Sequence, residues 1–99
     1  MLEVIQSETF ARWLTKLKDR QAVARINARI RRLSDSGNFG DVKPAREGVS
    51  EMRIDYGPGY RTYCMRRGPF LVVLLAGGDK STQDADIKRA IEIAKDWRD

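Results

Sequence analysis

The residues of this sequence that could carry chemistry are cationic and aromatic side chains in two short segments. In the run Arg53-Ile54-Asp55-Tyr56-Gly57-Pro58-Gly59-Tyr60-Arg61-Thr62-Tyr63, two arginines and a tyrosine stand at alternate positions, and Lys80 follows the glycine pair Gly77-Gly78. A guanidinium can donate paired hydrogen bonds to a phosphate, and an aromatic ring can stack on a nucleic-acid base. Glycines permit close backbone approach, and a helix starting after Lys80 would add free amide groups. These residue types therefore indicate binding of a phosphodiester.

The composition excludes histidine and zinc chemistry. The chain has no histidine and one cysteine, so a zinc site, an internal disulfide and an ordinary serine or cysteine triad cannot form. Metal-free cleavage of such a phosphodiester by a neighbouring hydroxyl would need a base for that hydroxyl, charge stabilisation at the phosphate and an acid for the departing oxygen. Without histidine, these roles fall to arginine, lysine, tyrosine or a carboxylate. We predict Arg53, Arg61 and Lys80 as catalytic residues and Tyr63 as a substrate-binding residue, with no metal and no cofactor.

Each of these assignments has a simpler alternative. An arginine on an exposed strand is often solvated or paired with a neighbouring strand, here Arg61 with Asp55, and Lys80 would then be an ordinary loop lysine. Gln83 fits a helix-capping role as well as a binding role. The further residues assigned to substrate binding are three cations of the central loop and a hairpin end, together with this glutamine: Lys43, Arg46, Arg66 and Gln83.

Positive charge is concentrated in the N-terminal half of the chain. The chain carries 19 Lys+Arg against 14 Asp+Glu, a formal net charge of +5, which favours polyanionic partners. Between Arg12 and Arg32 eight basic residues stand against the single acid Asp19. The densest part, Arg29-Ile30-Arg31-Arg32, suits contact with RNA phosphates or with an acidic partner, and it equally suits a solvated helix face.

Length and hydropathy predict one α+β domain spanning residues 1–99. At 99 residues and 41% hydrophobic content, the chain has the size and composition of a single packed domain. The longest strongly apolar run, residues 70–76, is far shorter than the roughly 20 residues needed to cross a bilayer. The N-terminus lacks the basic and apolar regions of a signal peptide. We therefore expect a cytoplasmic protein without a membrane span.

The N-terminal third should form a strand and a helical hairpin. Residues 2–4 alternate as a short strand does, and Ser7 can cap a helix whose apolar residues recur every three or four positions. Asp19 can cap a second helix that ends at Gly37, a residue that accepts the left-handed conformation. Residues 38–48 contain two glycines and a proline but few large apolar side chains, so we expect a surface loop there.

Residues 51–65 predict a hairpin that brings the candidate site together. Apolar and polar residues alternate before the turn Gly57-Pro58-Gly59, and a three-residue turn would place Arg53 opposite Tyr63. This register leaves Arg53, Arg61 and Tyr63 on one face of the sheet and turns Cys64 toward the helix-covered face, where it would be a packing residue.

The C-terminal third should supply a central strand and a covering helix. Residues 70–75 are apolar at every position, which is typical of a strand covered on both faces. A final helix, capped by Ser81 or Thr82, carries an apolar stripe from Ile87 to Trp97 that can cover the second face. The predicted order is β-α-α-β-β-β-α, with an antiparallel sheet packed by an N-terminal helical hairpin and a C-terminal helix.

Three sequence motifs resemble one known group of proteins. They are the hairpin R-I-D-Y-G-P-G-Y-R-x-Y from Arg53, the strand end L-L-x-G-G-D-K-S-x-Q from Leu74, and the helical segment D-I-K-R-A from Asp86. After a two-helix hairpin, this succession resembles the phage-related, HigB-like addiction-module killer proteins of the RelE/ParE toxin superfamily. The resemblance covers nearly the whole chain and implies a RelE/ParE-like fold.

The resemblance also implies a function and partners. Such proteins are type II toxins encoded beside a helix-turn-helix antitoxin, with which they form hetero-oligomers. Relatives on the RelE and HigB side cut mRNA within the ribosome and inhibit translation, which implies a metal-independent endoribonuclease here. Relatives on the ParE side poison DNA gyrase without nuclease chemistry. Several RelE relatives have an arginine at the position of Lys80 and a histidine or tyrosine near the chain end, both absent here. Ribonuclease, gyrase poison and an inactive phage-derived toxin that only binds its antitoxin therefore remain open.

Overall fold

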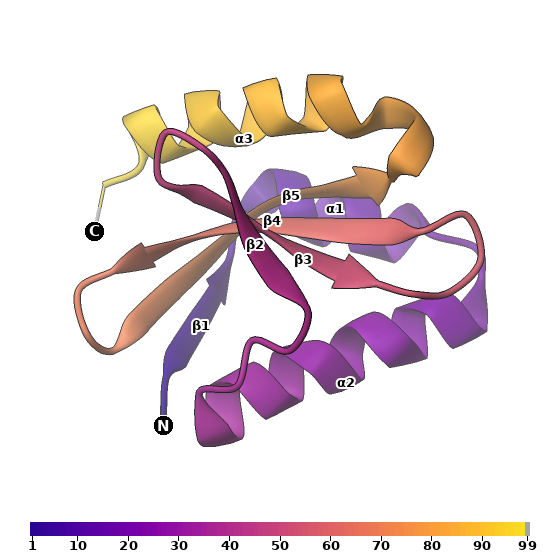
Figure 1. The fold of residues 1–99 in the computed structure, drawn as a ribbon, viewed down its shortest axis with the longest axis horizontal. Coiled ribbons are helices and arrows are strands. Elements are labelled where there is room, and N and C mark those ends of the chain that lie inside the picture. The colour runs from indigo at the N-terminus through magenta and orange to yellow at the C-terminus, as the bar shows by residue number, and fades with distance from the viewer. Residues whose placement is uncertain (99) are drawn as a thin grey trace.

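The protein has an α+β fold in which helices cover both faces of one five-stranded sheet (Figure 1). The computed structural model describes residues 1–98. In chain order the elements are β1 (Glu3–Gln6), α1 (Glu8–Lys16), α2 (Arg20–Ser36), β2 (Val42–Arg46), β3 (Val49–Ile54), β4 (Tyr60–Arg67), β5 (Leu71–Asp79), a 3₁₀ turn (Lys80–Thr82) and α3 (Gln83–Asp96). Every helix within residues 1–98 is too short or too polar to cross a membrane.

The sheet is mixed, which corrects the prediction of an antiparallel sheet. Its strand order is β1-β5-β4-β3-β2, and β1 runs parallel to β5 while every other neighbouring pair is antiparallel. The helical hairpin after β1 carries the chain to the far edge of the sheet. Three antiparallel steps then return it, so that β5 arrives beside β1 in the same direction.

The capping residues of the N-terminal helices are confirmed. The side chain of Ser7 accepts a hydrogen bond from the amide of Phe10, and Asp19 accepts from the amides of Gln21 and Ala22. Gly37 ends α2 in the left-handed conformation, with φ of 72°. These short polar side chains satisfy amides that have no partner inside the helix, so local sequence alone fixes both helix starts.

The expected surface loop between α2 and β3 contains a strand. β2 pairs antiparallel with β3, with Lys43 opposite Glu51, and it forms one edge of the sheet. The strand carries Pro44, has a register irregularity between Pro44 and Arg46, and exposes most of its residues. Proline is tolerated in an edge strand because one side of that strand has no ladder partner. The observed order therefore has one strand more than the prediction.

The hairpin register is offset from the prediction by two residues. Arg53 lies opposite Arg61, and Glu51 lies opposite Tyr63, because the connection runs over the five residues 55–59. An offset of two keeps each side chain on its predicted face, since successive residues of a strand point to opposite faces. The predicted cross-strand pair of Asp55 with Arg61 does not form, because Asp55 lies beyond the end of β3.

Two apolar clusters lie on opposite faces of the sheet. The α1 and α2 side gathers the buried residues Phe10, Ile26, Leu33, Met52, Ile54, Tyr60, Cys64, Val72 and Leu74. The α3 side gathers Val49, Tyr63, Met65, Val73, Leu75, Ala76, Ile87, Ala90 and Ile91. β5 contributes to both clusters, which confirms the prediction of a central strand covered on both faces. Cys64 is buried as predicted, and burial raises the pKa of its thiol to about 12.

The junction between β5 and α3 depends on close packing and on a cap that differs from the prediction. A side chain at Gly77 would overlap the indole of Trp13, and one at Gly78 would overlap the carboxylate of Asp86. Asp79 caps the 3₁₀ turn, since its carboxylate accepts hydrogen bonds from the amide and hydroxyl of Ser81. Thr82 occupies the predicted N-cap position of α3, but its side chain makes no capping hydrogen bond. The glycine pair therefore lets helices approach β5 from both faces just before Lys80.

Candidate functional site

The three cations predicted as catalytic lie around one open pocket of about 400 Å³. We call it the cationic pocket. It forms where the β3–β4 connection meets the end of β5, and its lining residues are Asp41, Arg53, Ile54, Asp55, Gly59, Tyr60, Arg61 and Lys80. The sequence prediction that Arg53, Arg61 and Lys80 share one region is therefore confirmed, although their catalytic role remains a prediction.

Arg53 and Arg61 are held close together by the ladder between β3 and β4. The two residues are directly opposite, and like charges in that arrangement repel each other unless each has a partner. Arg53 Nη2 donates to Asp41 Oδ1 at 2.9 Å, and Arg61 Nε lies 3.4 Å from Glu51 Oε2. The hydrogen bond between Arg53 and Asp41 lowers the pKa of Asp41 and raises the pKa of Arg53. The negative charges of Asp41 and Glu51 thus offset the repulsion between the two guanidiniums.

Lys80 reaches the pocket because the β3–β4 connection turns sharply at Gly59. This glycine has φ of 81°, a conformation that other residues rarely adopt. A side chain at that position would lie 3.4 Å from Arg61 Nη1 and 3.8 Å from the Cβ of Lys80. The carbonyl oxygen of Gly59 also accepts a hydrogen bond from Arg61 Nη1 at 2.9 Å. The turn therefore brings Arg61 beside the start of the 3₁₀ segment, where the Lys80 side chain is exposed.

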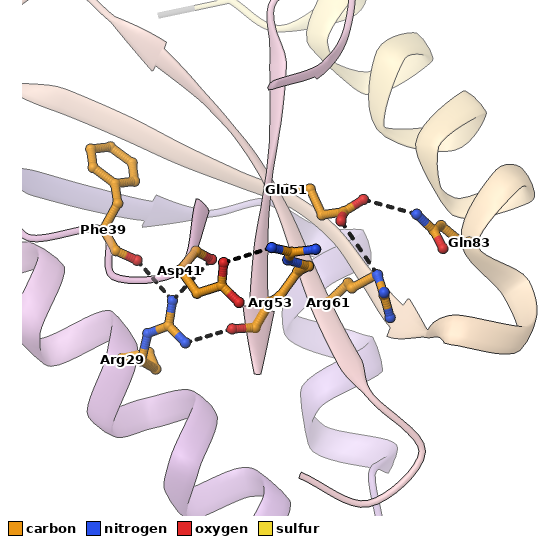
Figure 2. Close-up of polar contacts among 7 residues, drawn as sticks. All are labelled: Arg29, Phe39, Asp41, Glu51, Arg53, Arg61 and Gln83. Atoms are coloured by element: carbon orange, nitrogen blue, oxygen red, sulfur yellow. Dashed lines mark hydrogen bonds and ion pairs between the residues drawn. The ribbon is translucent and has the colours of Figure 1, made fainter. Parts of the chain in front are cut away.

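Arg29 of α2 donates hydrogen bonds to the backbone beside the cationic pocket (Figure 2). Its Nη1 donates to the carbonyl of Arg53 at 2.6 Å, and its Nη2 donates to the carbonyls of Phe39 at 2.8 Å and Asp41 at 3.4 Å. Gly40 leaves room for this guanidinium, since a Cβ there would lie 2.7 Å from Arg29 Nη2. Burial lowers the pKa of Arg29, and the nearby Arg32 adds to this effect. This arginine, predicted to contact a polyanion or solvent, instead anchors the backbone that carries Asp41 and Arg53.

Arg25, Arg29 and Arg32 of the basic segment line a surface beside the cationic pocket. A second open pocket of about 360 Å³ is lined by Arg25, Ala28, Arg29, Arg32, Ile54 and Asp55, so it shares Ile54 and Asp55 with the first. The Arg25 guanidinium lies 4.6 Å from the ring centroid of Tyr56. Contact of this surface with RNA or with an acidic partner remains a prediction.

Glu51 is a component of the site that the sequence interpretation missed. Its side chain is 1% exposed, and Gln83 Nε2 donates to its Oε1 at 3.0 Å while Arg61 approaches its Oε2 (Figure 2). The sequence indicated this burial, because Glu51 and Arg53 point to the same face of the strand and the final helix was expected to cover that face. Gln83, predicted to bind substrate or to cap the helix, uses its side-chain amide to hold this carboxylate.

Tyr63 cannot offer the exposed ring that base stacking needs. The residue has no exposed surface because α3 covers it, and it belongs to the apolar cluster on that side. Burial raises the pKa of its hydroxyl above the ordinary range, and the charges of Glu51 and Asp86 add to the effect. The prediction of an accessible aromatic surface at this residue is wrong. Tyr60 is the tyrosine that lines the cationic pocket.

The three remaining predicted binding residues lie outside the pocket lining. Lys43 is exposed on β2, and Arg46 Nη2 pairs with Asp84 Oδ1 of α3 at 3.1 Å. Arg66 donates to the carbonyls of Gly68 and Pro69 at the opposite end of β4. Five residues of extended chain separate it from Arg61, a distance of roughly 17 Å. The structure therefore does not bring Arg46 and Arg66 into the pocket lining, whereas the charge of Lys43 is near enough to help lower the pKa of Asp41.

The cationic pocket combines charge stabilisation with groups that can transfer protons. Two guanidiniums and an ammonium can surround a phosphodiester, and a guanidinium donates its hydrogen bonds in a fixed plane. Asp41 and Asp55 are carboxylates in the same lining, so the pocket holds both proton acceptors and a proton donor in Lys80. Within residues 1–98, no three acidic or cysteine side chains gather closely enough to hold a metal ion.

One known protein is similar to this chain over nearly its whole length. A Haemophilus influenzae protein (strain ATCC 51907 / DSM 11121 / KW20 / Rd), described as an uncharacterized protein, is 52% identical over 95 residues. The chain belongs to the family of this protein. The alignment covers 96% of the chain and 95% of the relative, so the similarity extends over nearly the whole fold. No protein-family model matches the chain.

Proposed function

We propose that this protein is the toxin of a type II toxin–antitoxin system and a metal-independent endoribonuclease that cleaves mRNA on the ribosome. The observation that carries the proposal is the convergence of Arg53, Arg61 and Lys80 on one open pocket. The sequence resemblance to HigB-like proteins supports a RelE/ParE-like fold, as does a helical hairpin that packs with one face of the sheet. In this proposal the protein acts in the cytoplasm.

The pocket supports a transesterification at the RNA backbone. The 2′-oxygen forms a bond to phosphorus, the bond from phosphorus to the 5′-oxygen breaks, and the products are a 2′,3′-cyclic phosphate and a free 5′-hydroxyl. Asp41 takes the proton of the 2′-hydroxyl, since it is a carboxylate that lines the pocket beside Arg53. Lys80 gives a proton to the departing 5′-oxygen. Arg53 and Arg61 hold the phosphate as negative charge grows on its oxygens.

The environment of Arg61 favours a role in charge stabilisation. Its side chain is 13% exposed, so its guanidinium lies in a partly dehydrated setting where an ionic hydrogen bond is stronger than in water. Arg53 is more exposed and is oriented by Asp41. We therefore assign the larger share of transition-state stabilisation to Arg61.

The basic surface beside the pocket supports a protein partner as well as RNA. In the proposal, a helix-turn-helix antitoxin encoded nearby covers the cationic pocket with acidic side chains and forms a hetero-oligomer with the toxin. The arginines of α2 and the pocket cations carry complementary charge for such a partner. The ribosome is the second partner, since phosphate contacts supply affinity with little sequence information.

A controlled expression experiment tests the proposal. Wild type, Arg61→Ala and the matched control Arg66→Ala are induced with and without the neighbouring gene, and growth and mRNA 5′ ends are recorded. We expect wild type and Arg66→Ala to arrest growth and to produce mRNA ends within ribosome-occupied codons, whereas Arg61→Ala does neither. Coexpression of the neighbouring gene should restore growth.

Two other outcomes would replace the proposed function. Growth arrest with intact mRNA and accumulated double-strand DNA breaks would identify a gyrase poison. Normal growth on expression of the wild-type protein, together with stable binding of the neighbouring gene's product, would identify an inactive toxin that only binds its antitoxin.

A further inference from the structure

The carboxylate of Glu51 is buried beside the guanidinium of Arg61, and this burial needs a physical explanation. Glu51 is 1% exposed, in a strand covered by α3. Removing a carboxylate from water is costly unless hydrogen bonds and an opposite charge compensate it. Gln83 compensates one oxygen of Glu51 with a hydrogen bond of 3.0 Å, and Arg61 compensates the other with an ion pair at 3.4 Å.

The contacts of Arg61 fix the plane of its guanidinium. Nε lies 3.4 Å from Glu51 Oε2 in an ion pair that does not have hydrogen-bond geometry, and Nη1 donates to the carbonyl of Gly59 at 2.9 Å. A guanidinium has five N–H donors. With the Nε edge facing Glu51 and one Nη1 proton engaged, the second Nη1 proton and both Nη2 protons remain for a ligand in the cationic pocket. Without Glu51, the bond to the Gly59 carbonyl would be the remaining hydrogen bond or ion pair given by the structure that orients the guanidinium of this 13% exposed side chain.

We propose that Glu51 is a positioning residue that holds the Arg61 guanidinium in the orientation required for phosphate binding, an inference that rests on the proposed ribonuclease function. Gln83 completes the arrangement, because its hydrogen bond to Oε1 leaves Oε2 directed at Arg61 (Figure 2). Gln83 is the first residue of α3, so the position of that helix is linked through Glu51 to the pocket.

Stability alone is a weak reason for this arrangement. Buried ion pairs often contribute little to folding, since well-packed apolar residues of similar volume can replace them without loss. Three buried polar atoms of this region have no hydrogen-bond partner: Glu51 Oε2, Arg61 Nε and the hydroxyl oxygen of Tyr63. A cluster built only for stability would satisfy its polar atoms more fully. We therefore attribute the free-energy cost of burying Glu51 to its role in holding the Arg61 side chain in a fixed geometry.

The test compares Glu51→Gln with and without Arg61→Ala. The glutamine keeps the size of the side chain and removes its charge, and Asp84→Asn serves as a control that removes an exposed carboxylate of α3. Proteins made by cell-free synthesis cleave mRNA on programmed ribosomes under single-turnover conditions. We expect Glu51→Gln to lower the cleavage rate about 10- to 100-fold with little change in half-saturating ribosome concentration, because misplacement of a catalytic group costs rate.

The double variant separates positioning from a general structural role. If Glu51 acts through Arg61, then adding Glu51→Gln to Arg61→Ala lowers the rate no further. An equal fall in both backgrounds, or an unchanged rate for Glu51→Gln alone, would overturn the proposal. Gln83→Ala provides a second, milder test that keeps the buried charge pair, and it should produce a smaller fall in the same direction.

A spectroscopic measurement decides the inference even if the protein cleaves no RNA. The Nε–H group of Arg61 should exchange slowly with solvent in ¹⁵N-labelled wild-type protein and at least about tenfold faster in Glu51→Gln, with melting temperature and amide spectra as controls for folding. Equal exchange in the two proteins would refute the positioning role. Absence of cleavage in wild type with the expected exchange difference would refute only the proposed ribonuclease function.

Discussion

Replacing Arg29 with alanine should destabilise the protein and loosen one wall of the cationic pocket. The guanidinium donates at 2.6 Å to the carbonyl of Arg53 and at 2.8 Å to that of Phe39, with a weaker contact of 3.4 Å to Asp41. A hydrogen bond from a charged group contributes about 1.5–3 kcal/mol. Water can reach these carbonyls once the side chain is removed, so we take the lower part of that range for the whole cluster. The expected loss is about 2 kcal/mol.

A loss of this size is easily measured for a chain of 99 residues. Each kcal/mol shifts the melting temperature by about 4–8 °C in domains of this length, so Arg29→Ala should melt roughly 10 °C below wild type. The effect should be local as well as global. Relative to wild type, Arg29→Ala should speed the exchange of the amides of the edge strand β2 more than that of the amides of β4. The reason is that Arg29 ties the start of β2 and the end of β3 to α2.

A neighbouring arginine provides the matched control for this experiment. Arg31 lies on the same helix with an exposed side chain, and its replacement by alanine removes equal charge. Arg31→Ala should melt within about 1 °C of wild type, as expected for a surface substitution. If Arg29→Ala and Arg31→Ala melt at the same temperature, then the contacts of Arg29 with the three carbonyls do not stabilise the fold, and our account of how Asp41 and Arg53 are held is wrong.

Three further results are expected. Gly77→Ala places a Cβ 2.3 Å from the indole of Trp13 and should cost about 1–3 kcal/mol in urea unfolding, a loss that Trp13→Phe should partly reverse. Hydrogen bonds from Ser81 lower the pKa of Asp79, so its stabilisation is complete above the unfolded-state pKa and is lost as pH falls through the folded-state value. Asp79→Asn should therefore be less stable than wild type at pH 7 and equally stable near about pH 2. With its pKa raised to about 12 by burial, Cys64 should react with a disulfide reagent at about pH 8 only after unfolding.

Local rules were enough to predict where both N-terminal helices start and where the second one ends. Ser7 and Asp19 accept hydrogen bonds from amides two or three residues further along, and Gly37 adopts the left-handed conformation within a few residues of the helix it ends. These interactions involve neighbours in sequence, so residue type and spacing determine them. The alternation that assigns strand residues to one face or the other is equally local, and it survived the error in hairpin register.

The missed features depend on contacts between segments far apart in sequence. β2 has an exposed face and contains Pro44, so it lacks the alternation of a half-buried strand and is defined by its pairing with β3. The burial of Tyr63 and Glu51 depends on α3, which begins 20 and 32 residues later; the pairing of Glu51 with Gln83 spans 32 residues. The role of Arg29 depends on three backbone carbonyls of other elements, which residue type does not reveal.

The ion pairs of the cationic pocket explain how two opposed guanidiniums can lie close together in the free protein while the pocket still attracts an anion. Arg53 and Arg61 face each other across a strand pair, and each has its own carboxylate, Asp41 from the start of β2 and Glu51 from β3. These two pairings offset the repulsion between the guanidiniums, whereas the exposed Lys80 adds a positive charge at the pocket rim. An arriving phosphodiester can compete with the exposed Asp41 for Arg53 but cannot displace the buried Glu51 from Arg61. In the proposed ribonuclease reaction, binding would free Asp41 to accept the proton of the 2′-hydroxyl while Arg61 stays in place.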